Sequence, residues 1–373
     1  MAVKPRFAIQ IGAVDELGAS DAEMYQEAII DARYAKDLGY EAVWTVEHHF
    51  SDYYPTPNPL MFLSHLAAAV PGIGLGSAVM VLPWYDPVRF AEDVAMLASL
   101  ARGPLYIGMG RGTAKLEYDA LRIDMNEARE RFRECWEITQ LALKGEPFTY
   151  DGTFTRITRP ITVRPRLDPS RKVNFVGAIG SPGSAEIMAD LGLAPLTLSQ
   201  FPDYMLAKIL ERWRRRMNDC GTPADDDAML PVSAKCFIGH TDAEAREEAR
   251  GHLARFYKLQ AEHYTTDTTP WADIKGYEQF AKIFANMKQM GDPAQNDPIL
   301  DRNLIGSPET VAKRINELRA IGFNYFLLSN SMHGVPRDVR HRMMRRFAKE
   351  VLPLVESLPV PDAPVFEKAS AAE

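Results

Sequence analysis

Two adjacent histidines, His48 and His49, follow the second short apolar run of the chain and stand between Glu47 and Phe50. A histidine at the end of a buried strand can donate a hydrogen bond or carry a proton near neutral pH. It can equally be a structural residue, and the residue types alone leave both roles open. The Glu-His-His segment also suggests a metal site, but no third ligand accompanies it at helical spacing. We therefore predict no metal.

A segment rich in glycine and serine, residues 177–184, is a candidate phosphate site. Glycines let the backbone approach an anion, and the helix that begins here presents unpaired amides and the positive end of its dipole. Arg111, between two glycines, can add the charged fork that a phosphate prefers. The spacing matches neither a Walker A motif nor a Gly-x-Gly-x-x-Gly fingerprint, and a tight turn with a capping serine is the alternative. The candidate phosphate-binding residues of the segment are Gly180, Ser181, Gly183 and Ser184.

The elements that must position these residues alternate between short apolar runs and longer amphipathic segments, which is typical of parallel β-α units. Eight strands and about eight helices are expected, and right-handed connections close such a sheet as a (β/α)8 TIM barrel of the α/β class. Active sites of this fold lie at the carboxyl ends of the strands, where His48, Arg111 and Ser181 all fall. The predicted strands are 7–11, 42–46, 73–82, 105–108, 173–176, 196–199, 231–238 and 325–329.

Helices are predicted between these strands, and two further segments depart from the alternation. Residues 148–166 alternate apolar and polar types around Asp151-Gly152, which predicts a β-hairpin excursion from the barrel. A long insertion between strands seven and eight, residues 265–302, is interpreted as a lid, with a disordered segment, a surface excursion or a dimer contact as the alternatives. The aromatic and apolar residues that could cover the site are Trp271, Tyr277, Phe280 and Met287. The principal helices are expected at 22–38, up to 69, from 86, and at 126–144, 181–192, 202–218, 242–260, 307–322 and 338–358.

We expect one barrel domain, residues 1–360, followed by a frayed tail at 361–373. Of the 373 residues, 46% are hydrophobic and 25% charged, as in ordinary globular enzymes. The net charge of −7 argues against nucleic acid as a partner, and no apolar window is long enough for a signal peptide or a membrane span. The three cysteines form no Cys-x-x-Cys pair. We therefore expect a cytoplasmic protein without membrane association.

Several segments resemble bacterial luciferase and the wider family of luciferase-like monooxygenases. The most specific is Trp44-Thr-Val-Glu-His-His-Phe50, and the resemblance continues in order from about residue 5 to 355. The other matching segments are 58–59, 76–79, 82–83, 86–89, 92–93, 108–112, 124–126, 134–136 and 306–328.

The resemblance implies a flavoprotein with a (β/α)8 fold, usually a homodimer, that takes reduced FMN from a separate flavin reductase. Oxygen adds to the reduced flavin, and the resulting flavin hydroperoxide oxygenates a small organic substrate. The family's catalytic histidine falls on His48. Its acidic residue beyond the arginine falls on Glu117, changed from aspartate.

The cofactor contacts that the resemblance implies fall on three strand ends. The strand that presses against the flavin ring, often through a cis non-proline peptide, falls on Ala78-Val79. The phosphate site falls on Arg111, Ser181 and Ser184, in agreement with the candidate phosphate segment.

Three positions depart from luciferase. The reactive cysteine just before the arginine is Gly110 here, an acidic residue of the phosphate loop is Gly180, and the tryptophan after strand six is Gln200. These changes reshape the cavity and argue against aldehyde-dependent light emission. The predicted activity is a two-component FMN-dependent monooxygenase acting on a small, fairly apolar or heteroaromatic compound. The alternatives are a deazaflavin-dependent hydride-transfer enzyme and a flavin-binding relative without catalysis.

Overall fold

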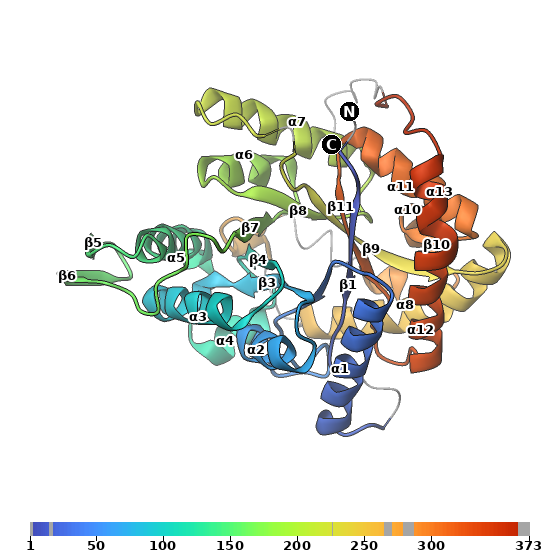
Figure 1. The fold of residues 1–373 in the computed structure, drawn as a ribbon, viewed down its shortest axis with the longest axis horizontal. Helices are drawn as coiled ribbons and strands as arrows, with labels where there is room; N and C mark the ends of the chain where they lie inside the picture. Colours follow the sequence, from blue (N-terminus) through green and yellow to red (C-terminus); the bar gives the residue numbers. More distant parts are fainter. Residues whose placement is uncertain (1–2, 15–17, 226, 265–270, 279–286, 365–373) are drawn as a thin grey trace.

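The computed structural model describes residues 3–14, 18–225, 227–264, 271–278 and 287–364. Parallel strands close into a barrel in the order β1-β2-β3-β4-β7-β8-β9-β11, and helices surround it (Figure 1). Strand β9 pairs with both β8 and β11, and β11 pairs with β1, which completes the ring. The predicted (β/α)8 barrel is confirmed.

The strand and helix bounds lie within a few residues of those expected from the sequence. The barrel strands are β1 (Arg6–Gln10), β2 (Ala42–Thr45), β3 (Gly74–Val81), β4 (Leu105–Gly110), β7 (Val173–Ala178), β8 (Ala194–Leu198), β9 (Pro231–Ile238) and β11 (Tyr325–Ser329). The α-helices among the described residues are α1 (Asp21–Asp37), α2 (Pro59–Ala69), α3 (Pro87–Leu100), α4 (Lys115–Leu121), α5 (Ala128–Leu143), α6 (Pro182–Asp190), α7 (Asp203–Asp219), α8 (Asp242–Tyr264), α10 (Asp297–Arg302), α11 (Pro308–Ile321), α12 (Arg337–Arg346) and α13 (Leu352–Ser357).

Side-chain caps determine where several of these helices begin. Ser20 and Glu23 form a capping box at the start of α1. Asp86 accepts a hydrogen bond from the backbone of Arg89 at the start of α3, where Pro87 occupies the first turn. These caps fix the residue at which each helix begins after its strand.

The hairpin predicted at residues 148–166 is present. Its strands β5 (Phe148–Asp151) and β6 (Arg156–Ile161) pair antiparallel and extend away from the barrel beside α5 (Figure 1). Glu134 of α5 accepts hydrogen bonds from the backbone N–H groups of Thr153, Phe154 and Thr155 in the connecting turn. The hairpin is therefore anchored to α5.

Several elements differ from the sequence expectation, among them the helix α10 (Asp297–Arg302) within the predicted insertion. The short helix α4 was not predicted because its seven residues are too few for a clear amphipathic period. The three-residue strand β10 (Leu304–Gly306) pairs with the end of β9, outside the barrel ring. The last predicted helix is divided by five residues of π-helix (Phe347–Val351), because Pro353 has no N–H to donate back into the helix.

Part of the predicted insertion packs onto the barrel mouth. Trp271, Ile274 and Tyr277 are buried against Tyr118 of α4 and Met125. This supports the interpretation of the insertion as a cover over the site. Phe280, another predicted member of the cover, lies outside the described residues, as do residues 365–373 of the predicted tail.

Candidate active site

A cavity of about 700 Å³ opens at the carboxyl ends of the barrel strands. Gly183 lies in the first turn of α6 and does not line this cavity. The other predicted site residues all line it, namely His48, Ala78, Val79, Arg111, Glu117, Gly180, Ser181 and Ser184. Tertiary folding therefore places segments from β2, β3, β4 and β7 at one mouth.

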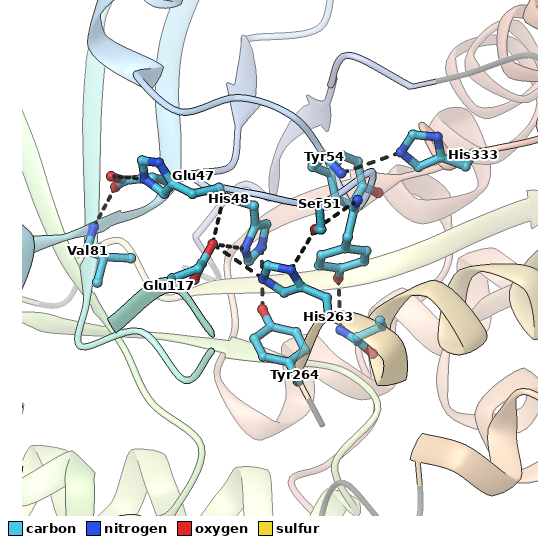
Figure 2. A network of polar contacts seen from close by, with 12 residues as sticks. Glu47, His48, Ser51, Tyr54, Val81, Glu117, His263, Tyr264 and His333 are labelled. Carbon is cyan, nitrogen blue, oxygen red and sulfur yellow. Dashed lines mark hydrogen bonds and ion pairs between the residues drawn. The ribbon is translucent and has the colours of Figure 1, made fainter. Parts of the chain in front are cut away.

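A polar cluster joins His48 to Glu117 and to a second histidine, His263 (Figure 2). The same carboxylate oxygen of Glu117, Oε1, lies 3.3 Å from Nδ1 of His48 and 3.3 Å from Nε2 of His263. It also accepts a 2.7 Å hydrogen bond from the backbone N–H of His49. Glu117 thus fixes the chain after β2, the helix α4 and the end of α8 around one carboxylate.

The histidine side chains have further partners on the far side of their rings. Nδ1 of His263 lies 2.7 Å from Oγ of Ser51, and Nε2 of His48 lies 3.4 Å from the hydroxyl of Tyr264. Because a carboxylate only accepts hydrogen bonds, the proton of neutral His48 lies on Nδ1, which faces Glu117. Nε2 of His48 is then a hydrogen-bond acceptor.

The electrostatics of the cluster favour an anionic Glu117 beside a neutral His48. Burial disfavours the charged carboxylate, but hydrogen bonds with His263 and His48 outweigh burial and hold the pKa of Glu117 at about 2. Burial lowers the pKa of His48 below its ordinary value, and the facing carboxylate only partly opposes this shift. At neutral pH the imidazole of His48 can therefore accept a proton.

His263 and Tyr264 were missed by the sequence analysis. The helix expected to end near residue 260 continues as α8 to Tyr264, and this extra turn carries both side chains into the cluster. The buried residues Leu253, Tyr257 and Ala261 continue the four-residue helical spacing past residue 260. That spacing was the signal that could have extended the helix and identified His263.

His263 also supplies the third ligand that the sequence argument against a metal did not find. One ligand atom each from His48, Glu117 and His263 lies within 4.8 Å of the others. Two imidazoles and a carboxylate are ligands that transition metals accept. The group could hold an ion, although all three side chains already contact one another.

Glu47, the first residue of the Glu-His-His segment, has a structural role distinct from that of His48. Its carboxylate accepts hydrogen bonds from the backbone N–H of Val81 at 2.7 Å and from the hydroxyl of Tyr85 at 2.8 Å. Nε2 of His49 lies 3.3 Å from the same carboxylate. Glu47 thereby ties the end of β3 to the segment that carries His48.

The wall formed by the end of β3 has an unusual backbone. The peptide bond between Ala78 and Val79 is cis, and the register of β3 with β4 shifts between Ser77 and Met80. A Cβ atom at Gly110 would lie 2.6 Å from Cγ2 of Val79. The replacement of the luciferase cysteine by Gly110 therefore matches the close approach of β4 to this wall.

The candidate phosphate segment forms the start of α6 as expected. Oγ of Ser181 caps the helix and lies 3.0 Å from Oγ of Ser184. A Cβ atom at Gly183 would have no heavy atom within 4 Å, and one at Gly180 would meet only Phe201, at 3.8 Å. Space for a bound group is therefore present above the first turn of the helix.

Arg111 lines the same cavity as Ser181 and Ser184 and has an unsatisfied nitrogen. Its Nη1 atom is buried and has no hydrogen-bond partner within the described part of the chain. The guanidinium lies 4.8 Å from the ring centre of Tyr277, which covers it. A buried guanidinium nitrogen without an acceptor is costly unless a ligand supplies one. The arginine, the serines and the open helix start thus fit the phosphate of a flavin mononucleotide.

Comparisons with known proteins identify the family. The profile of the family described as luciferase-like monooxygenase matches residues 8–325, so the chain belongs to the luciferase-like monooxygenases. The predicted family is confirmed, and monooxygenase is the enzyme class that the family description gives. Within the described residues, no helix is both long enough and apolar enough to cross a membrane.

Curated relatives include enzymes with named substrates. The chain is 28% identical to N-acetyl-S-alkylcysteine monooxygenase of Bacillus subtilis, over 63% of this chain and 67% of that protein. It is 23% identical to the alkanal monooxygenase alpha chain of the Kryptophanaron alfredi symbiont, over 86% of this chain and 90% of that protein. Two uncharacterized proteins of Sinorhizobium fredii, y4vJ and y4wF, are 34% and 32% identical, but the matches span less than half of their lengths.

Solved structures share the fold. The monooxygenase RslO1 of Streptomyces bottropensis superposes with a TM-score of 0.77 at 25% identity, over 93% of this chain and 99% of that one. The oxygenating constituent of 3,6-diketocamphane monooxygenase of Pseudomonas putida, solved with FMN, gives a TM-score of 0.74 at 18% identity, over 97% and 100%. An F420-dependent secondary alcohol dehydrogenase gives 0.71 at 15% identity, over 94% and 99%, so the fold by itself does not select the cofactor.

Proposed function

We propose that this protein is a two-component FMN-dependent monooxygenase, which uses reduced FMN and O2 to oxygenate a small organic substrate. The observation that carries the proposal is that the unsatisfied Nη1 of Arg111 and the cluster of His48 with Glu117 line one cavity. A phosphate anchor and a proton acceptor in one cavity are what flavin-dependent oxygen chemistry needs from the protein.

Each group has a defined task in this proposal. Reduced FMN, when bound, supplies the electrons that activate oxygen. Arg111 binds the phosphate together with the hydroxyls of Ser181 and Ser184 at the start of α6. Glu117 holds the proton of His48 at Nδ1, so that Nε2 is ready to accept a proton in the cavity. The covered, partly apolar walls keep water from the reacting atoms.

The partners follow from the relatives. The diketocamphane enzyme is described as an oxygenating constituent, which supports a separate flavin reductase as the source of reduced FMN for this chain as well. We further propose a cytoplasmic homodimer. Light scattering on the purified protein, with and without FMN, tests the dimer: a mass of one chain of 41.8 kDa contradicts it.

An anaerobic titration with reduced FMN, followed by rapid mixing with oxygenated buffer, tests the proposed function in the wild type and in His48→Ala. We expect reduced FMN to bind both proteins. After mixing, the wild type should delay the return of oxidised flavin absorbance, and the delay should shorten at least tenfold in the variant. Failure to bind reduced FMN, or equally fast return in both proteins, contradicts the proposal. Binding of a reduced deazaflavin instead supports the hydride-transfer alternative.

A further inference from the structure

A lysine that the proposed reaction does not use lies inside the barrel mouth. Lys235 is near the end of β9 and lines the same cavity as His48 and Arg111. The strand register places it beside Ser329 of β11, which in turn is beside Gln10 of β1. Three adjacent strands therefore present a row of polar side chains at one level of the mouth.

The position of Lys235 relative to the proposed cofactor site follows from the order of the strands. In the ring β1-β2-β3-β4-β7-β8-β9-β11, strand β9 stands opposite β3, which carries Ala78 and Val79. A group held at Lys235 would thus face the β3 wall across the cavity. The phosphate region of Arg111, at the ends of β4 and β7, is a different part of the mouth.

The ammonium group of Lys235 has little to neutralise it. Within the described chain its one hydrogen bond runs from Nζ to Oγ of Ser329, at 3.1 Å. Its other close neighbour is the ring of Phe256, whose centre lies 3.7 Å from Nζ. Burial lowers the pKa of Lys235 to about 7, with no carboxylate opposing the shift. A buried cation without an anion is an expensive feature to retain.

The carboxylates that line the cavity are already engaged elsewhere. Glu117 contacts His48 and His263, and Glu47 accepts from the backbone of Val81. The remaining cavity carboxylates pair with other side chains, Glu130 with Lys275, Glu137 with Tyr150 and Asp190 with Arg216. None of these partners is Lys235, so none of the described carboxylates of the cavity neutralises its ammonium group.

We propose that Lys235 binds a carboxylate group of the organic substrate, so that the enzyme acts on small organic acids. This inference rests on the proposed monooxygenase function and narrows its substrate class. A carboxylate at Lys235 forms a charge-assisted hydrogen bond in a low-dielectric site and leaves the remainder of the molecule directed across the cavity toward the β3 wall. Lys235 is thereby a specificity residue, distinct from the proton acceptor His48.

Protonation links this binding to pH. The charged form of Lys235 binds the carboxylate, so affinity is highest below pH 7 and falls up to about tenfold per pH unit above it. Among the described residues, the titratable and charged groups that line the same cavity include His48, Glu117, Arg111 and Tyr54, and Tyr257 packs against Phe256, the ring beside Lys235. Burial raises the pKa of Tyr54 and Tyr257 above the ordinary tyrosine value, so both stay neutral between pH 6 and 9. Burial lowers the pKa of His48 below the ordinary histidine value, so His48 stays neutral above pH 7 and a loss of carboxylate affinity there reports Lys235.

Matched pairs of ligands test the proposal, namely phenylacetate with phenylacetamide and hexanoate with hexanamide. Their dissociation constants are measured by calorimetry on the protein loaded with FMN, from pH 6 to 9. At pH 6.5 the wild type should bind the carboxylate of a pair at least tenfold more tightly than the amide. The preference should be lost in Lys235→Met and kept in Lys258→Met, a control lysine exposed on α8. Only carboxylate affinity should fall above pH 7.

The outcomes separate this inference from the proposed function. FMN binding by Lys235→Met shows that the variant is folded, and removal of an unpaired buried charge should not lower its stability. If FMN binds and no carboxylate preference exists in the wild type, the carboxylate inference is overturned while the monooxygenase proposal stands. A preference that survives in Lys235→Met also overturns it. Failure of reduced FMN to bind the wild type in the anaerobic titration overturns the proposed function itself.

Discussion

At the amino-terminal end of the barrel the inward-facing arginine is paired, whereas at the carboxyl-terminal end the cations are not. Arg6 donates from Nε to Glu41 at 2.7 Å and from Nη2 to the hydroxyl of Tyr106. Arg111 and Lys235 at the mouth have no ion pair with a described carboxylate. A charge that the protein neutralises itself needs no ligand, and one left without a partner is available to a ligand.

The packing differs in the same way. Below the mouth, Trp44 is fully buried and stacks on Tyr106 with ring centres 5.4 Å apart. Its Nε1 donates to the hydroxyl of Tyr325 at 3.1 Å. At the mouth, the cavity of about 700 Å³ takes the place of such a filled layer. Changes at the two ends should therefore separate stability from ligand binding.

The largest effect is expected from Trp44→Ala at the filled end. Loss of a fully buried indole leaves a cavity and should lower the free energy of unfolding by about 3–5 kcal/mol. Urea denaturation followed by circular dichroism measures this loss. The control Phe50→Ala removes an exposed ring and should change stability by less than about 0.5 kcal/mol. A loss below about 1 kcal/mol in Trp44→Ala would show that the filled end does not hold the barrel together.

Glu117 should make stability depend on pH at the open end. Its pKa of about 2 in the folded state lies below the ordinary glutamate value, so the stabilisation is present above about pH 4.5 and is lost as pH falls toward 2. The stabilisation lost over this range is about 3 kcal/mol in total. Urea denaturation at a series of pH values should show a shallower acid loss in Glu117→Gln than in the wild type. The exposed control Glu146→Gln should lose stability with falling pH as the wild type does. If Glu117→Gln also shows the wild-type dependence of unfolding free energy on pH, the ion-pair geometry is contradicted.

The substitution Arg111→Met should weaken the binding of reduced FMN without lowering the stability of the fold. A hydrogen bond to a charged group contributes about 1.5–3 kcal/mol, so the dissociation constant should rise roughly 10-fold to 100-fold. Anaerobic fluorescence titration measures it, with the exposed Arg102→Met as the matched control. Unchanged FMN affinity together with a large loss of stability would show that Arg111 stabilises the fold. The two ends of the barrel would then not differ in the role of their charged residues.

The smallest effect is expected from metal removal. Because His48, Glu117 and His263 already contact one another, we expect incubation with EDTA to leave oxygen uptake in the presence of reduced FMN unchanged. The measurement is repeated after addition of Zn²⁺, Mg²⁺ or Mn²⁺. If EDTA lowers oxygen uptake and one of these ions restores it, the cluster is a metal centre.

Much of the barrel follows from local sequence patterns. Alternating apolar runs and caps such as Asp86-Pro87 predict strands and helices within a few residues, because these signals act over one or two turns. The missed elements carry weak local signals. Helix α4 has seven residues, and the last turn of α8 is stabilised by contacts of His263 that come from distant segments. The family resemblance placed Glu117 in the site without showing what held it.

By itself the sequence determined the succession of β-α units, the family, and the residue types available at the strand ends. Tertiary structure alone decided which of them meet. Glu117 joins His48 across 69 positions of sequence, and within the described part of the chain Lys235 lies at the mouth without a carboxylate paired to its ammonium. The physical reason is range: hydrophobic periodicity and caps act between neighbours along the chain, whereas burial, charge pairing and pKa depend on every segment that closes around a group.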